Sequence, residues 1–149
     1  TPATNMLYAL AEAIDMLHEE GLDNVFARHK RHAEATRRAV ASWGLENLVT
    51  NEQDYSPVLT AVLVPDGHNA DALRKTILDH FDLSLGTGLS KVAGKVFRIG
   101  HLGDTNDLTI IGTLAGVEMG LGLAKVPHNT GGVAAAMTYL AATAKPFPG

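Results

Sequence analysis

The fold is decided by one stretch of sequence, Gly86–Asp104, which reads GTGLSKVAGKVFRIGHLGD. Its second half, Lys95–Gly100, is rich in residues of high β-propensity and predicts a strand. Side chains alternate between the two faces of a strand. Arg98 should therefore point away from the face that its apolar neighbours Phe97 and Ile99 share.

Two further strands are predicted before this one. The residues at 58–64 are mostly β-branched or leucine and stand between Pro57 and Pro65, where a ladder donor is not needed. A short strand is expected over Phe81–Leu85, and the glycine-rich segment 86–89 then predicts a loop.

Helices are predicted between and after the strands. They run from the N-cap Asn69 to about His80, from Asp104 or Thr105 to about Leu121, and from Val133 to Ala142. Leu78 and Leu108 are among the residues expected to face the core. Frequent glycines, such as Gly112, Gly116 and Gly120, indicate either close helix packing or a weak helix. This order of elements predicts an α/β or α+β fold, with helices packed on a small sheet.

The first 44 residues predict two helices. Apolar residues at spacings of three and four indicate a first helix with one buried face: Met6, Leu10, Ile14 and Leu17. Gly21 should end it. A second helix is expected over 22–43, with Phe26 on or near its inner stripe and the charges of Arg28–Arg38 on its outer face. Together the two helices predict a connecting arm.

Composition excludes several classes of protein. The 149 residues are 46% hydrophobic and 19% charged, with a formal net charge of −4, as in an ordinary globular protein with one core. No cysteine is present, which excludes a disulfide scaffold and a thiolate metal site. The densest basic run, Arg28–Arg38, includes alanines and Glu34, so nucleic-acid binding is not indicated. No apolar run reaches the roughly 18 residues of a membrane span.

Arg98 has the strongest chemical signal. It stands inside an apolar strand, and burying an unpaired charge is unfavourable by several kcal/mol. Three interpretations are open: a structural ion pair, a strand face open to water, and a clamp for a carboxylate. The clamp is attractive because a guanidinium offers two parallel N–H groups that match the two oxygens of a carboxylate.

Other chemical patterns are weak. His29 and His32 lie three apart on a predicted helix without a third ligand at a helical spacing, so we interpret them as solvated histidines and predict no metal site. No Gly-x-Ser-x-Gly elbow is present, and a serine nucleophile is therefore not indicated. The pair Gly86 and Gly88 is too short for a dinucleotide fingerprint.

The stretch Gly86–Asp104 resembles the C-terminal signature of the alanine–glyoxylate and serine–glyoxylate aminotransferases, class V members of the fold-type I pyridoxal-phosphate enzymes. Residues 1–10, TPATNMLYAL, look like the family segment that follows the cofactor-binding domain. Residues 131–137, GGVAAAM, are similar to the serine–glyoxylate branch in particular. The resemblance covers essentially the whole chain, and its fairly specific core is Lys-Val-x-Arg-Ile-Gly.

This resemblance implies a domain organisation. Residues 1–44 would be connecting helices, and 45–149 would be the C-terminal small domain of a fold-type I aminotransferase with its terminal helix. The catalytic large domain would be absent from the chain. The start at Thr1 is accordingly expected to be a cut rather than a natural terminus.

The resemblance also implies site residues. Arg98 matches the arginine that holds the substrate α-carboxylate, and Thr1 matches a residue that reaches the cofactor phosphate of the neighbouring subunit. Gly86 and Gly88 correspond to a loop near the active site, although a tight turn between strands explains them equally well. The lysine that forms a Schiff base with pyridoxal 5'-phosphate lies upstream in the family. None of the six lysines here occupies its position, so this chain alone is expected to be inactive and without covalent cofactor.

For the parent enzyme, the resemblance implies transfer of an amino group from serine, or alanine, to glyoxylate. Its partners would be small amino and keto acids and further copies of itself in a homodimer or larger homo-oligomer, without nucleic acid or membrane. Two alternatives remain: another amino donor, such as ureidoglycine or an aminophosphonate, and a non-enzymatic α/β binding or assembly module that uses Arg98. A cytoplasmic location is expected, with the peroxisome left open although the sequence does not end in Ser-Lys-Leu.

Overall fold

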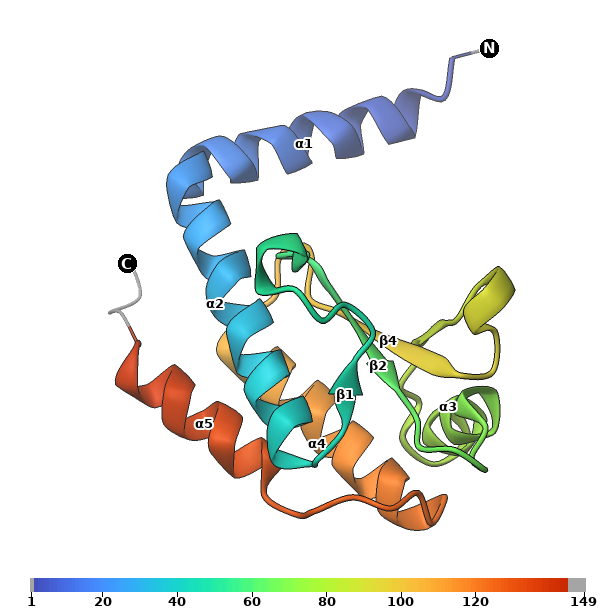
Figure 1. Ribbon diagram of the computed structural model, residues 1–149. Helices are drawn as coiled ribbons and strands as arrows, with labels where there is room; N and C mark the ends of the chain where they lie inside the picture. Colours follow the sequence, from blue (N-terminus) through green and yellow to red (C-terminus); the bar gives the residue numbers. More distant parts are fainter. Residues whose placement is uncertain (1, 145–149) are drawn as a thin grey trace.

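The computed structural model describes residues 2–144 (Figure 1). In chain order its elements are α1 (Thr4–Glu20), α2 (Leu22–Ser42), β1 (Glu46–Asn47), the 3₁₀ turn η1 (Glu52–Asp54), β2 (Leu59–Leu63), α3 (Ala70–Phe81), β3 (Gly86–Thr87), the 3₁₀ turn η2 (Ser90–Val92), β4 (Val96–Gly100), α4 (Asp107–Leu123) and α5 (Gly132–Ala142).

The strands form one antiparallel sheet in the order β1-β2-β4-β3. The two central strands pair along their whole length, from Leu59 opposite Gly100 to Leu63 opposite Val96. Both edge strands have only two residues each. A small antiparallel sheet combined with helices confirms the predicted fold class.

Helices α2 to α5 share one hydrophobic core with the sheet. α2 packs on α5 and on β2, while α3 packs on α4 and β4 (Figure 1). The sheet contributes Val62, Phe97 and Ile99, each at most 1% exposed, and the helices contribute Val40 and Leu114 among others. α2 thus belongs to the same core as the residues that follow it, and the division of the chain at residue 44 stays a prediction.

α1 is a helix, but the prediction that one of its faces is buried is wrong for this chain. The chain bends sharply between α1 and α2, with Gly21 (φ +81°) at the bend, and α1 lies apart from the sheet (Figure 1). The predicted apolar positions are 40–73% exposed, and within residues 2–144 no residue of α1 is buried. The periodicity of the apolar residues correctly indicates a helix. Burial of their face also requires a surface that packs against it, and the described residues provide none for α1. Phe26 on α2, at 56% exposure, also faces outward.

The strand predicted over Phe81–Leu85 and the loop predicted over 86–89 are also wrong. α3 continues through Phe81 and ends at Asp82 in the left-handed conformation. The strand instead comes five residues later, at Gly86–Thr87, where it pairs with Phe97 and Arg98 of β4. Backbone hydrogen bonds make this pairing, so neither apolar alternation nor β-propensity in the sequence predicts the strand.

The start of α4 differs from the prediction by one or two residues. Its N-cap is Asn106, whose side chain accepts a hydrogen bond from the backbone N–H of Thr109 at 2.9 Å. With this start, Ile110 is buried and Leu108 is 80% exposed, so the prediction that Leu108 faces the core is wrong. Leu78 on α3 is likewise exposed.

The glycines of α4 mark close helix packing. A Cβ on Gly120 would lie 2.1 Å from Cγ1 of Ile77 on α3, and one on Gly116 would lie 2.8 Å from Cδ2 of Leu83. In contrast, a Cβ on Gly112 would meet nothing within 4 Å. The first two positions therefore need glycine for space, and the third does not.

This contrast makes a matched pair of variants. Gly120→Ala is expected to lower the free energy of unfolding by about 1–3 kcal/mol, because α3 and α4 must separate to admit the methyl group. Gly112→Ala on the same helix should raise it by up to about 1 kcal/mol, because alanine loses less backbone entropy on folding. Denaturant titration measures both. Equal stability of the two variants would contradict the close packing.

Candidate functional site

Arg98 lies at the centre of β4, on the sheet face opposite the core. Its neighbours on the same strand, Phe97 and Ile99, are buried in the core, as the alternation predicts. Across the sheet it stands opposite Ala61 of β2 and Gly86 of β3. The side chain is partly buried in this position.

The Arg98 guanidinium has no protein partner among residues 2–144. Neither a hydrogen bond nor an ion pair within 4.0 Å reaches it from that part of the chain, and its Nε is buried without a hydrogen-bond partner. The other described arginines are all paired with carboxylates: Arg28, Arg31, Arg37, Arg38 and Arg74. A structural ion pair within the described chain is therefore excluded for Arg98, and the carboxylate clamp and the open strand face remain.

The turn between β3 and β4 is tight next to this arginine. Gly88 donates its backbone N–H to Val96 O at 3.2 Å, which extends the pairing beyond β3. A Cβ on Gly88 would lie 2.1 Å from Val92 O, so no other residue fits there without moving η2. Gly88 thus has a structural role in the turn, whereas Gly86 belongs to the sheet.

The remaining predicted site residues are not brought together with Arg98. Thr1, predicted to reach a cofactor phosphate, lies outside the described residues. Lys91 and Lys95, which lie within the stretch Gly86–Asp104, are exposed. The candidate site therefore consists of Arg98 and the strands around it.

The interpretation of His29 and His32 as solvated histidines is wrong. They are 6% and 0% exposed, because the segment between β4 and α4 covers this side of α2. His29 Nδ1 donates to Val25 O at 2.7 Å, and its Nε2 accepts the backbone N–H of Gly103 at 3.1 Å. His32 Nε2 lies 3.1 Å from a carboxylate oxygen of Asp107. Burial lowers the pKa of His32, and this hydrogen bond opposes the shift.

A third histidine, His101, is fully buried beside them. Its Nδ1 donates to Pro57 O at 3.0 Å, so in the neutral ring Nε2 accepts from the Thr60 hydroxyl at 3.0 Å. Burial lowers the pKa of His101 to about 4. Through these hydrogen bonds the three imidazoles hold residues 101–107, the segment that directly follows β4, against α2 and β2. Sequence spacing could not predict this arrangement, because the spacing of residues along a helix does not show which segment packs against them.

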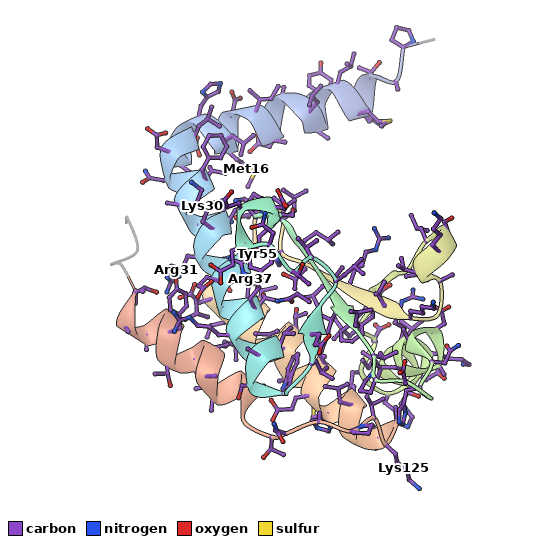
Figure 2. All side chains as sticks on the ribbon, viewed as in Figure 1. Met16, Lys30, Arg31, Arg37, Tyr55 and Lys125 are labelled. Carbon is purple, nitrogen blue, oxygen red and sulfur yellow. The ribbon has the colours of Figure 1, made fainter. Side chains whose placement is uncertain are left out.

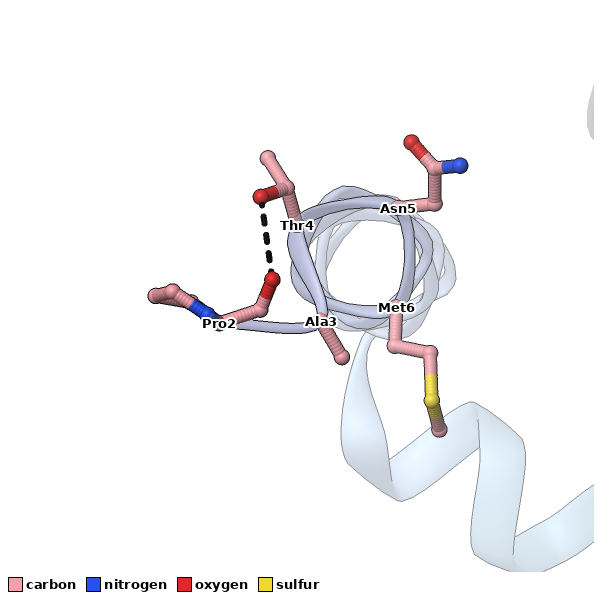
Figure 3. A pocket seen from close by; sticks show the side chains of 5 residues that line it. All are labelled: Pro2, Ala3, Thr4, Asn5 and Met6. Atoms are coloured by element: carbon pink, nitrogen blue, oxygen red, sulfur yellow. Dashed lines mark hydrogen bonds between the residues drawn. The ribbon is translucent and has the colours of Figure 1, made fainter.

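Two hollows on the surface of the described chain lie away from Arg98. One, of about 360 Å³, is lined from α2 and the 52–57 segment, where Figure 2 shows Arg37 next to Tyr55. The guanidinium carbon of Arg37 lies 4.7 Å from the centre of that ring. The other is formed by five consecutive residues at the start of α1, Pro2 to Met6 (Figure 3). One short segment lines it, so it offers no convergent groups for a ligand.

No cluster of three or more potential metal ligands occurs among residues 2–144. In the same range, no helix is long and apolar enough to cross a membrane.

Comparison with known proteins identifies homologues of the chain. No protein-family profile matches the chain. The serine–glyoxylate aminotransferase of Arabidopsis thaliana is 50% identical over 141 residues, and that of Methylorubrum extorquens is 48% identical over 143 residues. Each alignment covers 94% of this chain. The chain is a homologue of the serine–glyoxylate aminotransferases. It spans 35% of the length of these two relatives.

The fold agrees with this homology to the serine–glyoxylate aminotransferases. The crystal structure of the ureidoglycine–glyoxylate aminotransferase from Bacillus subtilis superposes with a TM-score of 0.88 at 31% sequence identity. The superposition covers 95% of this chain and 37% of that protein. Both comparisons therefore match nearly all of this chain to about a third of an aminotransferase.

Proposed function

We propose that this chain supplies the substrate-carboxylate arginine, Arg98, of a pyridoxal-phosphate-dependent aminotransferase that moves an amino group from serine, or alanine, to glyoxylate. The observation that carries the proposal is the Arg98 guanidinium, held in the centre of a sheet without a partner from the described chain. A half-buried cation of this kind gains most from a ligand that brings the matching anion and accepts two hydrogen bonds.

The substrates share the group that Arg98 would recognise. Serine, alanine and glyoxylate differ at the amino or carbonyl carbon and in the side chain, but all carry a carboxylate on that carbon. One guanidinium can therefore orient both the donor and the acceptor in turn. Its role is positional: fixing the carboxylate restricts the rotation of the reacting carbon and places it for proton transfer.

The described part of the chain does not fit the covalent attachment of the cofactor. A Schiff-base lysine must be neutral to react, which favours a desolvated site. The described lysines, Lys30, Lys75, Lys91, Lys95 and Lys125, are all exposed, and Lys75 is paired with Asp79 at 2.6 Å. We therefore propose that the cofactor lysine belongs to the rest of the parent enzyme. Pyridoxal phosphate would supply the electron sink there, while this chain contributes the carboxylate contact.

The amino donor and the partners of the parent enzyme are also part of the proposal. We favour serine because the relatives at 48–50% identity carry the name serine–glyoxylate aminotransferase. Partners are proposed for the exposed apolar stripe of α1, which the rest of the parent chain or a second subunit would cover. An exposed stripe of this length is unusual on a protein without such a partner.

The test is a transamination assay with the full-length parent enzyme and glyoxylate, comparing serine with alanine. Formation of glycine with serine as the preferred donor is the expected result, and this chain alone should form none. Activity with alanine but not serine would change the donor and keep the family. Absence of activity with any amino donor would contradict the proposal and favour the binding-module alternative.

A further inference from the structure

Arg98 is flanked across the sheet by the two smallest side chains that a protein offers. Residues directly opposite each other in an antiparallel pair have side chains on the same face, about 4.5–5.5 Å apart at Cβ. Opposite Arg98 these are Ala61 on β2 and Gly86 on β3. The arginine therefore lies in a slot with one methyl group on one side and a bare backbone on the other.

The Gly86 side of this slot is too tight for a side chain unless Arg98 gives way by a few tenths of an ångström. A Cβ on Gly86 would lie 3.0 Å from the Arg98 Cβ, 3.0 Å from its Nε and 3.5 Å from its Cζ. The first two distances are shorter than ordinary carbon contacts of about 3.5–4.0 Å. The Arg98 side chain consequently lies against the backbone of β3, and its Nε is buried.

Backbone conformation does not explain the glycine. The glycines of the described chain with positive φ include Gly21, Gly67 and Gly94, but not Gly86. Gly86 lies in a β-strand, a conformation that other residues adopt without strain, and glycine lowers strand stability. What Gly86 provides is therefore space for Arg98.

β3 cannot easily move away to make that space. On one side of Gly86, Arg74 Nε donates to Leu85 O at 2.7 Å. On the other side, the Thr87 hydroxyl donates to Asp71 Oδ1 at 2.9 Å, and Arg74 also donates to that carboxylate oxygen. The strand is thus fixed to α3 before and after the glycine. A side chain at position 86 would have to displace the Arg98 guanidinium instead.

We infer that Gly86 is a positioning residue for the reaction: by lacking a side chain, it sets where the Arg98 guanidinium lies and so where the substrate carboxylate binds. This inference rests on the proposed function of Arg98. It predicts that crowding at position 86 harms the enzyme only through the arginine.

A double-mutant cycle in the full-length parent enzyme tests it. Gly86→Ala is expected to lower kcat/KM for serine by about 10-fold when Arg98 is present, since a misplacement of about 1 Å can cost about 10²-fold in rate and the shift needed here is smaller. In an Arg98→Ala background the same change should have an effect of less than about twofold, because the group through which Gly86 acts is gone. Gly100→Ala on β4 is the control, since a Cβ there meets nothing within 4 Å.

A binding measurement complements the kinetics. Glycerate carries a hydroxyl where serine carries its amino group, so it retains the carboxylate but forms no Schiff base. Gly86→Ala should raise its dissociation constant by about 10-fold, and again only when Arg98 is present. If Gly86→Ala does not fold, Ala61→Val crowds the same guanidinium from β2 and is expected to give the same pattern in the same cycle.

The outcomes separate the two claims. If Arg98→Ala itself is unimpaired, the proposed function of Arg98 fails. If Arg98→Ala is impaired while Gly86→Ala matches the wild type, only the inference about Gly86 is overturned. Equal losses from Gly86→Ala in both backgrounds would also overturn it, because they would show a structural effect independent of the arginine.

Discussion

Arg98→Ala in the full-length parent enzyme is expected to lower kcat/KM for serine and glyoxylate by about 10²-fold or more. Each charged hydrogen bond contributes roughly 1.5–3 kcal/mol, and each 1.36 kcal/mol lost in the transition state is about tenfold in rate. Losing two such bonds to one carboxylate is therefore expected to lower the rate by more than about 10²-fold. Both kcat and the apparent affinity for the donor should fall, because the contact binds the substrate and orients it.

The fold should tolerate this substitution. Arg98 has no hydrogen-bond or ion-pair partner within residues 2–144, so its removal leaves no carboxylate of the described chain unpaired. A normal thermal midpoint together with a large kinetic loss is the expected combination. Arg98→Lys should fall between wild type and Arg98→Ala, because it keeps the charge without the two parallel N–H groups.

Arg38→Ala is a suitable control for the kinetics. This arginine lies on α2, is paired with Glu34 at 2.7 Å and has half of its side chain exposed. Its removal should change kcat/KM by less than about twofold. An unimpaired Arg98→Ala enzyme would leave the family assignment intact and make Arg98 a structural residue on an open strand face.

The second large effect is expected from His101 when the pH falls. In the folded protein its pKa is lowered to about 4 by burial, whereas an unfolded chain binds the proton near the ordinary value of about 6.5. Between these values the unfolded state carries more protons, so acid favours unfolding. Stability is unaffected by this group above about pH 6.5 and decreases as the pH falls to about 4. The total decrease from this group is about 3 kcal/mol.

Two measurements check this prediction. The ring protons of His101 should show by NMR a titration midpoint near pH 4. In His101→Asn, the side-chain amide can still donate to Pro57 O, but the residue no longer titrates. The loss of stability between pH 6.5 and 4.5 should therefore be smaller in this variant than in the wild type. His80→Asn, at an exposed position on α3, is the control, and parallel curves for wild type and His101→Asn would contradict the prediction.

The sequence was sufficient for the elements with strong local signals. Alternation along Val96–Gly100 placed Phe97 and Ile99 in the core, and the Asn69 side chain caps α3 as expected. It was insufficient wherever a partner far along the chain decides the outcome. The short strand at Gly86 exists because β4 offers it a backbone ladder, and no property of glycine predicts that.

The candidate site divides in the same way. Arg98 could be singled out from the sequence because an arginine between apolar strand residues is conspicuous. The slot around it could not, because Ala61 and Gly86 lie 37 and 12 residues away along the chain and only the register of the sheet brings them opposite Arg98. The buried histidines were missed for a related reason, since the segment that covers them follows more than 60 residues later.

The two-residue edge strands affect more than the shape of the sheet. A sheet edge is where foreign strands add on, and a long unpaired edge is a template for fibrous aggregation. Here β1 and β3 are so short that they offer few free backbone N–H and C=O groups for pairing with a strand of another molecule. The risk of aggregation during synthesis lies instead on α1, whose apolar residues stay exposed until another part of the protein or a partner covers them.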